Sequence, residues 1–128
     1  MQSQQGIIME KILRTQVIYA MSRHNLPVAH VPSGSDVCFE TCDCFSDQIT
    51  SEQAVFNELD WKHINPATGP IFVENAQPGD VLRVEIKSII LHSQQAVMVT
   101  APGLGVIGDE LVQPQIRTVP IEDGYAHL

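Results

Sequence analysis

The chain has 128 residues, of which 44% are hydrophobic and 17% charged, and its net charge is −8. These values are typical of one globular domain over residues 1–128 and exclude a disordered chain. The acidic charge and the scattered Lys and Arg residues argue against a nucleic-acid partner and a membrane surface. No apolar run approaches the roughly 18 residues of a transmembrane helix. Without a signal-peptide pattern, and with an odd number of cysteines, the cytoplasm is the expected compartment.

Short strand patterns follow one another along the chain. Alternating and β-branched residues predict strands at residues 11–20, 28–31, 36–41, 71–73, 81–91, 95–100 and 115–121. Residues 50–59 are the one predicted helix, because Thr50 and Gln53 have the spacing of a capping box. Residues 1–10 are expected to be a loose lead-in. Turn signals at intervals of about 8–12 residues predict a mostly β fold, an antiparallel, jelly-roll-like β-sandwich with one short helix.

Polar side chains concentrate where the predicted strand 36–41 ends. Asp43 and Asp47 follow this strand, a position at which a sheet often delivers functional groups into a loop. Asp43 is a candidate metal ligand or general base, and the alternative is that it caps the turn through an Asx hydrogen bond. Cys44 is disfavoured as a nucleophile, since the neighbouring carboxylate raises the pKa of a thiol.

Other motifs carry weaker signals. His63, in the long connection 60–70, is a candidate for substrate contact. Residues 103–108 fit G-x-G-x-x-G by letter, but a predicted strand follows where a dinucleotide site requires a helix. We therefore expect these glycines to allow a tight path close to other backbone.

Several motifs together resemble one known family. They are Phe39-Glu40-Thr41 with Asp43, Gln48-Ile49, Asn65-Pro66-Ala67-Thr68-Gly69-Pro70 with Val73, and Pro78-Gly79-Asp80-Val81-Leu82 with Val84. Tyr19-Ala20-Met21-Ser22 and Val99-Thr100-Ala101-Pro102-Gly103-Leu104-Gly105 belong to the same set. In this order and spacing they resemble the acetamidase/formamidase family, from about residue 12 to the last residue.

The resemblance implies hydrolysis of short linear amides, such as formamide or acetamide, to a carboxylate and ammonia. It also implies a homodimer and a divalent metal, with zinc expected and calcium as the second candidate. Family members are more than twice as long, and their second half carries a Gly-Asp…His segment and an acidic cluster. The chain thus resembles the N-terminal part of a larger α+β amidase fold.

The resemblance also implies roles for three candidate residues that lie in the matched motifs. Asp43 is expected to bind the metal or orient the attacking water, and Asn65 and Thr68 are expected to position the small amide. The alternative is an inactive β-sandwich fragment that acts as a structural or interaction module, or one that needs a partner chain to complete its sheet.

Overall fold

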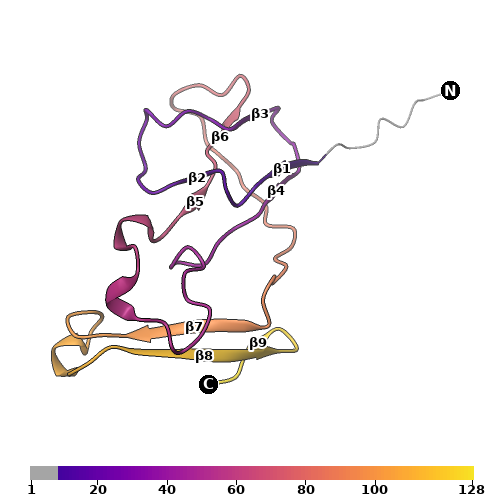
Figure 1. The fold of residues 1–128 in the computed structure, drawn as a ribbon. Coiled ribbons are helices and arrows are strands. Elements are labelled where there is room, and N and C mark those ends of the chain that lie inside the picture. Colours follow the sequence, from indigo (N-terminus) through magenta and orange to yellow (C-terminus); the bar gives the residue numbers. More distant parts are fainter. Residues whose placement is uncertain (1–8) are drawn as a thin grey trace. The chain divides into compact units, whose positions relative to one another are not determined.

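The structure is a computed structural model that describes residues 9–128, so most of the expected lead-in lies outside the described residues. The described part contains nine short strands and three 3₁₀ helices (Figure 1). They are β1 (Glu10–Ile12), β2 (Val17–Ile18), β3 (Ala29–Val31), β4 (Val37–Phe39), η1 (Phe56–Glu58), η2 (Trp61–His63), β5 (Ala67–Thr68), β6 (Ile71–Val73), β7 (Gln95–Thr100), η3 (Gly108–Glu110), β8 (Gln115–Glu122) and β9 (Tyr125–Ala126). The prediction of a mostly β chain is confirmed, and the sandwich stays a prediction. No helix among the described residues is long and apolar enough to cross a membrane.

The chain divides into two compact units. The first unit comprises Met1–Asp47 and Asp60–Leu82, and the second comprises Gln48–Leu59 and Arg83–Leu128. Each unit is therefore built from two stretches of chain that are separated in sequence.

Three two-stranded ladders form the first unit. β2 pairs with β5 in antiparallel fashion, whereas β1 pairs with β4 and β3 pairs with β6 in parallel. The prediction of antiparallel pairing is therefore wrong for two of these ladders. Ile12 and Val31 are buried at the ends of β1 and β3, so burial of these two side chains anchors both parallel pairs.

A turn interrupts the predicted strand 11–20. The backbone N–H of Gln16 donates to the carbonyl of Leu13 over 2.9 Å, and the Gln16 side chain accepts from the N–H of Leu13 over 2.9 Å. A side chain that accepts from a nearby backbone N–H in this way stabilises a turn in place of the hydrogen bonds between neighbouring strands. The predicted strand is therefore split into β1 and β2, which pair with different partners.

The second unit is organised around the antiparallel sheet β7–β8–β9 (Figure 1). Six residue pairs join β7 to β8, from Gln95 opposite Pro120 to Thr100 opposite Gln115. The predicted strand 95–100 is confirmed, and the predicted strand 115–121 is confirmed with one further residue. The buried side chains of Val119, Ala101, Ile49 and Leu59 supply the apolar core of this unit.

The predicted helix 50–59 is wrong. The N–H of Ala54 donates to the carbonyl of Ser51 in a single turn, Val55 is extended, and only Phe56–Glu58 is helical, as a 3₁₀ turn. A ten-residue helix is too short to be stable from propensity alone. The extended β-branched Val55 ends the first turn before a second can form.

The predicted strand 81–91 is also wrong. The structure assigns neither helix nor strand to these residues, and all of them are exposed. A strand needs a neighbour that takes up its N–H and C=O groups. No described segment forms a ladder with residues 81–91, so they are not part of a sheet despite their alternating sequence.

The glycine-rich loop of residues 103–108 follows a tight path, as predicted. The N–H of Gly103 donates to the carbonyl of Gly108 over 3.1 Å. A Cβ atom at Gly108 would lie 2.8 Å from the carbonyl carbon of Gly103. Only the three-residue η3 follows, which is too short for the helix that a dinucleotide site requires.

Candidate functional site

The loop after β4 is closed by two aspartates that cap each other's backbone. Asp43 Oδ1 accepts hydrogen bonds from the N–H groups of Phe45 and Asp47, both over 2.8 Å. Asp47 Oδ1 accepts in return from the N–H of Asp43 over 3.0 Å. Ser46 and Asp47 have the left-handed φ values of 55° and 56° that this tight path requires. The Asx-turn alternative for Asp43 is therefore confirmed.

Basic side chains from the β1 region neutralise the acids around this loop. The guanidinium of Arg14 forms an ion pair with Asp47 Oδ2. Lys11 Nζ lies 2.6 Å from Glu40 Oε1, and the N–H of Arg14 lies 3.4 Å from Glu40 Oε2. The hydrogen bond from Lys11, followed by that from Arg14, lowers the pKa of Glu40 from its ordinary value. The same contact raises the pKa of Lys11.

This pair makes the stability of the first unit depend on pH in the acid range. A carboxyl whose pKa is lowered by folding stabilises the folded state above its unfolded pKa of about 4.3, and this contribution is lost as the pH falls through the folded pKa. We therefore expect the unfolding free energy of the first unit to fall more steeply below about pH 4.3 than it does in a Glu40→Gln variant. Urea unfolding followed by the fluorescence of Trp61, which lies in this unit, measures the difference.

Glu74→Gln is the matched control for this measurement. Glu74 belongs to the same unit, and its carboxylate makes no ion pair with a described residue. The control should keep the pH slope of the unaltered chain. A Glu40→Gln variant with that same slope would contradict the role of the Lys11–Glu40 pair.

Two hydrogen bonds to backbone carbonyl groups join the connection 60–70 to the chain around Asp43. The N–H of Asn65, whose φ is 53°, donates to the carbonyl of Cys44 over 2.7 Å. The Thr68 hydroxyl donates to the carbonyl of Glu40 over 2.7 Å. The structure therefore brings the segments of all three predicted site residues together. Among the described contacts, no hydrogen bond joins the side chains of Asp43, Asn65 and Thr68 to one another.

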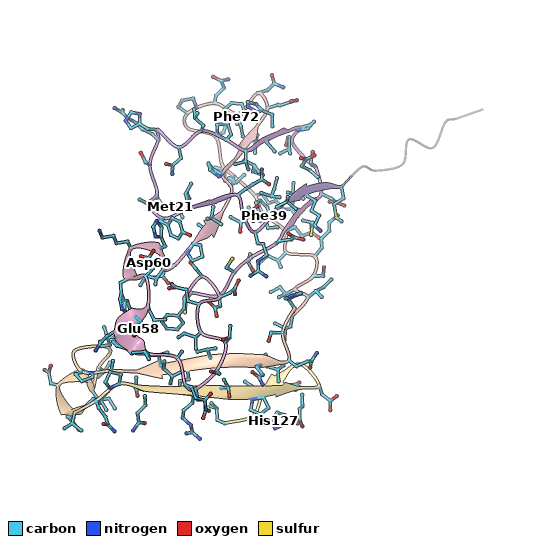
Figure 2. The ribbon with its side chains drawn as sticks, viewed as in Figure 1. Met21, Phe39, Glu58, Asp60, Phe72 and His127 are labelled. Carbon is cyan, nitrogen blue, oxygen red and sulfur yellow. The ribbon has the colours of Figure 1, made fainter. Side chains whose placement is uncertain are left out.

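A histidine–aspartate pair lies on the same connection. Asp60, at the start of η2 (Figure 2), places Oδ2 2.5 Å from His63 Nδ1. The hydrogen bond from His63 lowers the pKa of Asp60. The Tyr19 ring packs edge-on against the imidazole at 4.8 Å, and the Ser46 hydroxyl donates to the His63 carbonyl. Sequence reasoning considered His63 but missed its partner, although the i, i+3 spacing of the two residues was the signal.

The chemistry of this pair follows from its geometry. When Nδ1–H donates to a carboxylate, the neutral imidazole carries its lone pair on Nε2. The carboxylate of Asp60 thus favours the Nδ1–H tautomer of His63, and the Tyr19 ring packs against one side of the exposed imidazole. Such an imidazole is suited to accepting and returning a proton at Nε2.

The cysteines do not form a reactive centre. Cys44 is exposed, but partial burial of its thiol and then the charge of Asp43 raise its pKa, which disfavours the thiolate. Cys42 Sγ donates to the carbonyl of Arg14 over 3.7 Å. Cys38 and Cys42 are half-buried.

The described residues do not form a metal site by themselves. Within residues 9–128, no group of three or more His, Cys, Asp or Glu side chains could hold a metal ion, whereas a zinc site needs at least three protein ligands. Asp43 offers Oδ2, because Oδ1 is engaged by two backbone N–H groups. An open hollow of about 420 Å³ in the first unit is lined by Ile18, Met21, Ser22, Arg23, Asn25 and Pro70 and includes none of the predicted site residues.

Comparison with known proteins relates this chain to one family. A family model described as the acetamidase/formamidase family matches residues 18–127. The crystal structure of an acetamidase from Bacillus halodurans matches with a TM-score of 0.75 and 36% identity, over 91% of this chain and 42% of that one. The structure of a predicted acetamidase/formamidase from the thermophile Thermoanaerobacter tengcongensis matches with a TM-score of 0.86 and 43% identity, over 92% and 39%. No curated protein matches the chain.

Two conclusions follow from these matches. The chain spans about two fifths of the length of the solved structures that it resembles. The family match covers most of the chain, including both segments of the candidate site, and the chain therefore belongs to the acetamidase/formamidase family.

Proposed function

We propose that this chain contributes the N-terminal part of an amidase that hydrolyses short linear amides, such as formamide or acetamide, to a carboxylate and ammonia. The family match over residues 18–127 is the observation that carries the proposal. It includes the loop of Asp43 and the connection that holds Asn65 and Thr68, which hydrogen bonds join within the first unit.

Amide hydrolysis needs an activated water, polarisation of the carbonyl group and a proton for the leaving amine. Asp43 orients the water through Oδ2, since the two N–H bonds to Oδ1 fix the plane of the carboxylate. The Asn65 side chain hydrogen-bonds the amide. Thr68 accepts from the amide N–H groups, because its own hydroxyl hydrogen is donated to Glu40.

His63 is the proton carrier in this proposal. Its Nε2 takes a proton from the attacking water and returns it to the leaving nitrogen, while Asp60 holds the Nδ1–H side of the ring. The divalent metal that the resemblance implies, zinc or calcium, stays a prediction with Asp43 as one ligand. A metal site would need ligands beyond those that the described residues supply. The cytoplasmic location and the homodimer also stay predictions.

The test is a chimera in which this chain replaces the corresponding part of the Bacillus halodurans acetamidase, which is 36% identical to it. We expect the chimera to release ammonia from acetamide or formamide. Asp43→Asn should lower kcat by about 10²–10⁴-fold, because it keeps the acceptor oxygen of the loop but removes the charge that orients the water. Ammonia release is measured by a coupled assay under single-substrate conditions.

Glu74→Gln, which removes an acidic charge outside the candidate site, is the control and should keep the rate of the chimera. An active chimera that tolerates Asp43→Asn would remove Asp43 from the mechanism. A folded chimera that releases no ammonia would favour the second reading, an interaction module. One observation supports that second reading directly, namely the exposed apolar residues 81–91.

A further inference from the structure

The open hollow of about 420 Å³ in the first unit lies outside the candidate site and combines apolar walls with one cation. Its apolar lining residues are Ile18, Met21 (Figure 2) and Pro70, and its polar ones are Ser22, Arg23 and Asn25. Ligand pockets commonly have volumes of about 300–1,000 Å³ and apolar walls with a few placed polar groups. The hollow therefore has the size and the composition of a site for a small amphipathic ligand.

Hydrogen bonds hold both walls of this hollow. The backbone N–H of Asn25 donates to the carbonyl of Ser22 over 3.1 Å, and its side-chain amide donates to the carbonyl of Ala20 over 2.8 Å. On the other wall, the carbonyl of Pro70 accepts from the N–H of Val28 over 2.8 Å. Because these contacts exist before a ligand arrives, less conformational freedom is lost when one binds.

Arg23 is a cation whose charge no described carboxylate neutralises. The ion pairs of the described residues involve other side chains. Arg23 Nε donates to His24 Nε2 over 3.3 Å, which orients the guanidinium and leaves its two terminal NH₂ groups for a ligand. Ser22 Oγ accepts from the N–H of His24 over 3.2 Å, so its hydroxyl hydrogen is also available to an acceptor. These donors call for an anionic group.

We propose that this hollow binds a monocarboxylate with a short aliphatic chain. Arg23 pairs with the carboxylate, since the terminal NH₂ groups of a guanidinium donate two parallel hydrogen bonds to such a group, and the Ser22 hydroxyl donates a third. The aliphatic chain packs against Ile18, Met21 and Pro70. A sulfate or phosphate ion would leave this apolar wall unused. The site is separate from the proposed amidase site and does not depend on that function.

The first experiment follows the backbone N–H signals of the full chain by NMR during titration with hexanoate at constant ionic strength. We expect saturable shifts at Ile18, Ser22, Arg23 and Asn25, with a dissociation constant of about 1–10 mM, because solvent screens a charge pair in an open hollow. Hexanamide, the neutral analogue, should bind about fivefold more weakly. Sulfate at the same concentration should not displace hexanoate.

The second experiment removes the cation. Arg23→Gln should weaken the binding of hexanoate about fivefold and leave that of hexanamide unchanged, because only the carboxylate pairs with the guanidinium. Lys62→Gln is the matched control, since it removes an exposed cation of the same unit that does not line the hollow. This control should keep the affinity for hexanoate, although it changes the net charge by the same amount.

The third experiment tests the apolar wall. Affinity should rise about twofold for each methylene group from acetate to hexanoate, because the open hollow buries each group only in part. Met21→Gln should weaken hexanoate about threefold and leave acetate unchanged. Leu26→Gln is the control, because Leu26 is 84% exposed, as against 83% for Met21, and does not line the hollow.

Four outcomes would overturn the proposal. They are hexanamide that binds as tightly as hexanoate, sulfate that displaces hexanoate, an Arg23→Gln variant with unchanged affinity, and an affinity that does not rise with chain length. If hexanoate instead shifts the N–H signals of Asp43 and its neighbours and leaves those of Ile18 and Arg23 unmoved, the carboxylate binds at the candidate site and the hollow is not its site. All of these measurements are made without turnover, so a failure of the proposed amidase function would not affect them.

Discussion

Replacing Asp43 by alanine is expected to lower the unfolding free energy of the first unit by about 2–3 kcal/mol, because one carboxylate oxygen satisfies two backbone N–H groups there. Alanine leaves both donors unpaired in a partly buried loop and releases Ser46 and Asp47 from their left-handed conformation. Urea unfolding followed by the fluorescence of Trp61 measures the loss, since this single tryptophan lies in the same unit.

Asp43→Asn separates the structural role of this residue from its charge. The asparagine side chain offers the same acceptor oxygen to Phe45 and Asp47, so we expect a cost of only about 0.5 kcal/mol. Glu74→Ala, at an exposed acid of the same unit, is the control for loss of an acidic side chain. An asparagine variant as unstable as the alanine variant would show that the charge, and not the acceptor geometry, holds the loop.

Gly108→Ala is expected to destabilise the second unit by about 2–3 kcal/mol, because the new methyl group would meet backbone rather than a movable side chain. The nearest atoms are the carbonyl carbon, nitrogen and Cα of Gly103, at 2.8, 3.0 and 3.1 Å. The loop connects β7 to β8, so its displacement should raise hydrogen exchange at the Thr100 end of the ladder first.

Gly105→Ala is the matched control in the same loop. A Cβ atom at Gly105 meets nothing within 4 Å, but its φ is +74°, so only the cost of a left-handed alanine applies, about 1 kcal/mol. If both variants lose the same stability, the close approach of Gly108 to Gly103 is not what constrains the loop.

The strands that could be predicted are those in which an alternating residue pattern lies between clear turn residues. β6 and β7 match their predicted bounds, and β8 differs by one residue, because alternating β-branched residues lie between Pro, Gly and Asp turns. Parallel pairing of β1 with β4 and of β3 with β6 could not be predicted, since the choice of partner strand depends on contacts distant in sequence. Residues 81–91 have the right local pattern, but a strand exists only where a neighbour accepts its hydrogen bonds.

The candidate site was predictable in its residues and less so in its contacts. The position of Asp43 just after a predicted strand indicated a functional or capping carboxylate, and the structure shows the cap. The bond from Asn65 to the Cys44 carbonyl joins segments about twenty residues apart, and no local pattern encodes it. Asp60 and His63 are three residues apart, so their spacing in the sequence already allowed the pair. The two side chains meet because the helical turn η2 forms between them.

The carboxylate of Glu52 protects part of one edge of β8. It accepts from the N–H of Thr118 over 2.9 Å, on the edge of β8 that faces away from β7. Two residues further along the same edge, Pro120 has no N–H to offer. A strand from another molecule approaching this edge would find one donor occupied, one donor missing and a negative charge in its path. β8 therefore resists open-ended templated growth, by the means with which β proteins commonly protect their sheet edges.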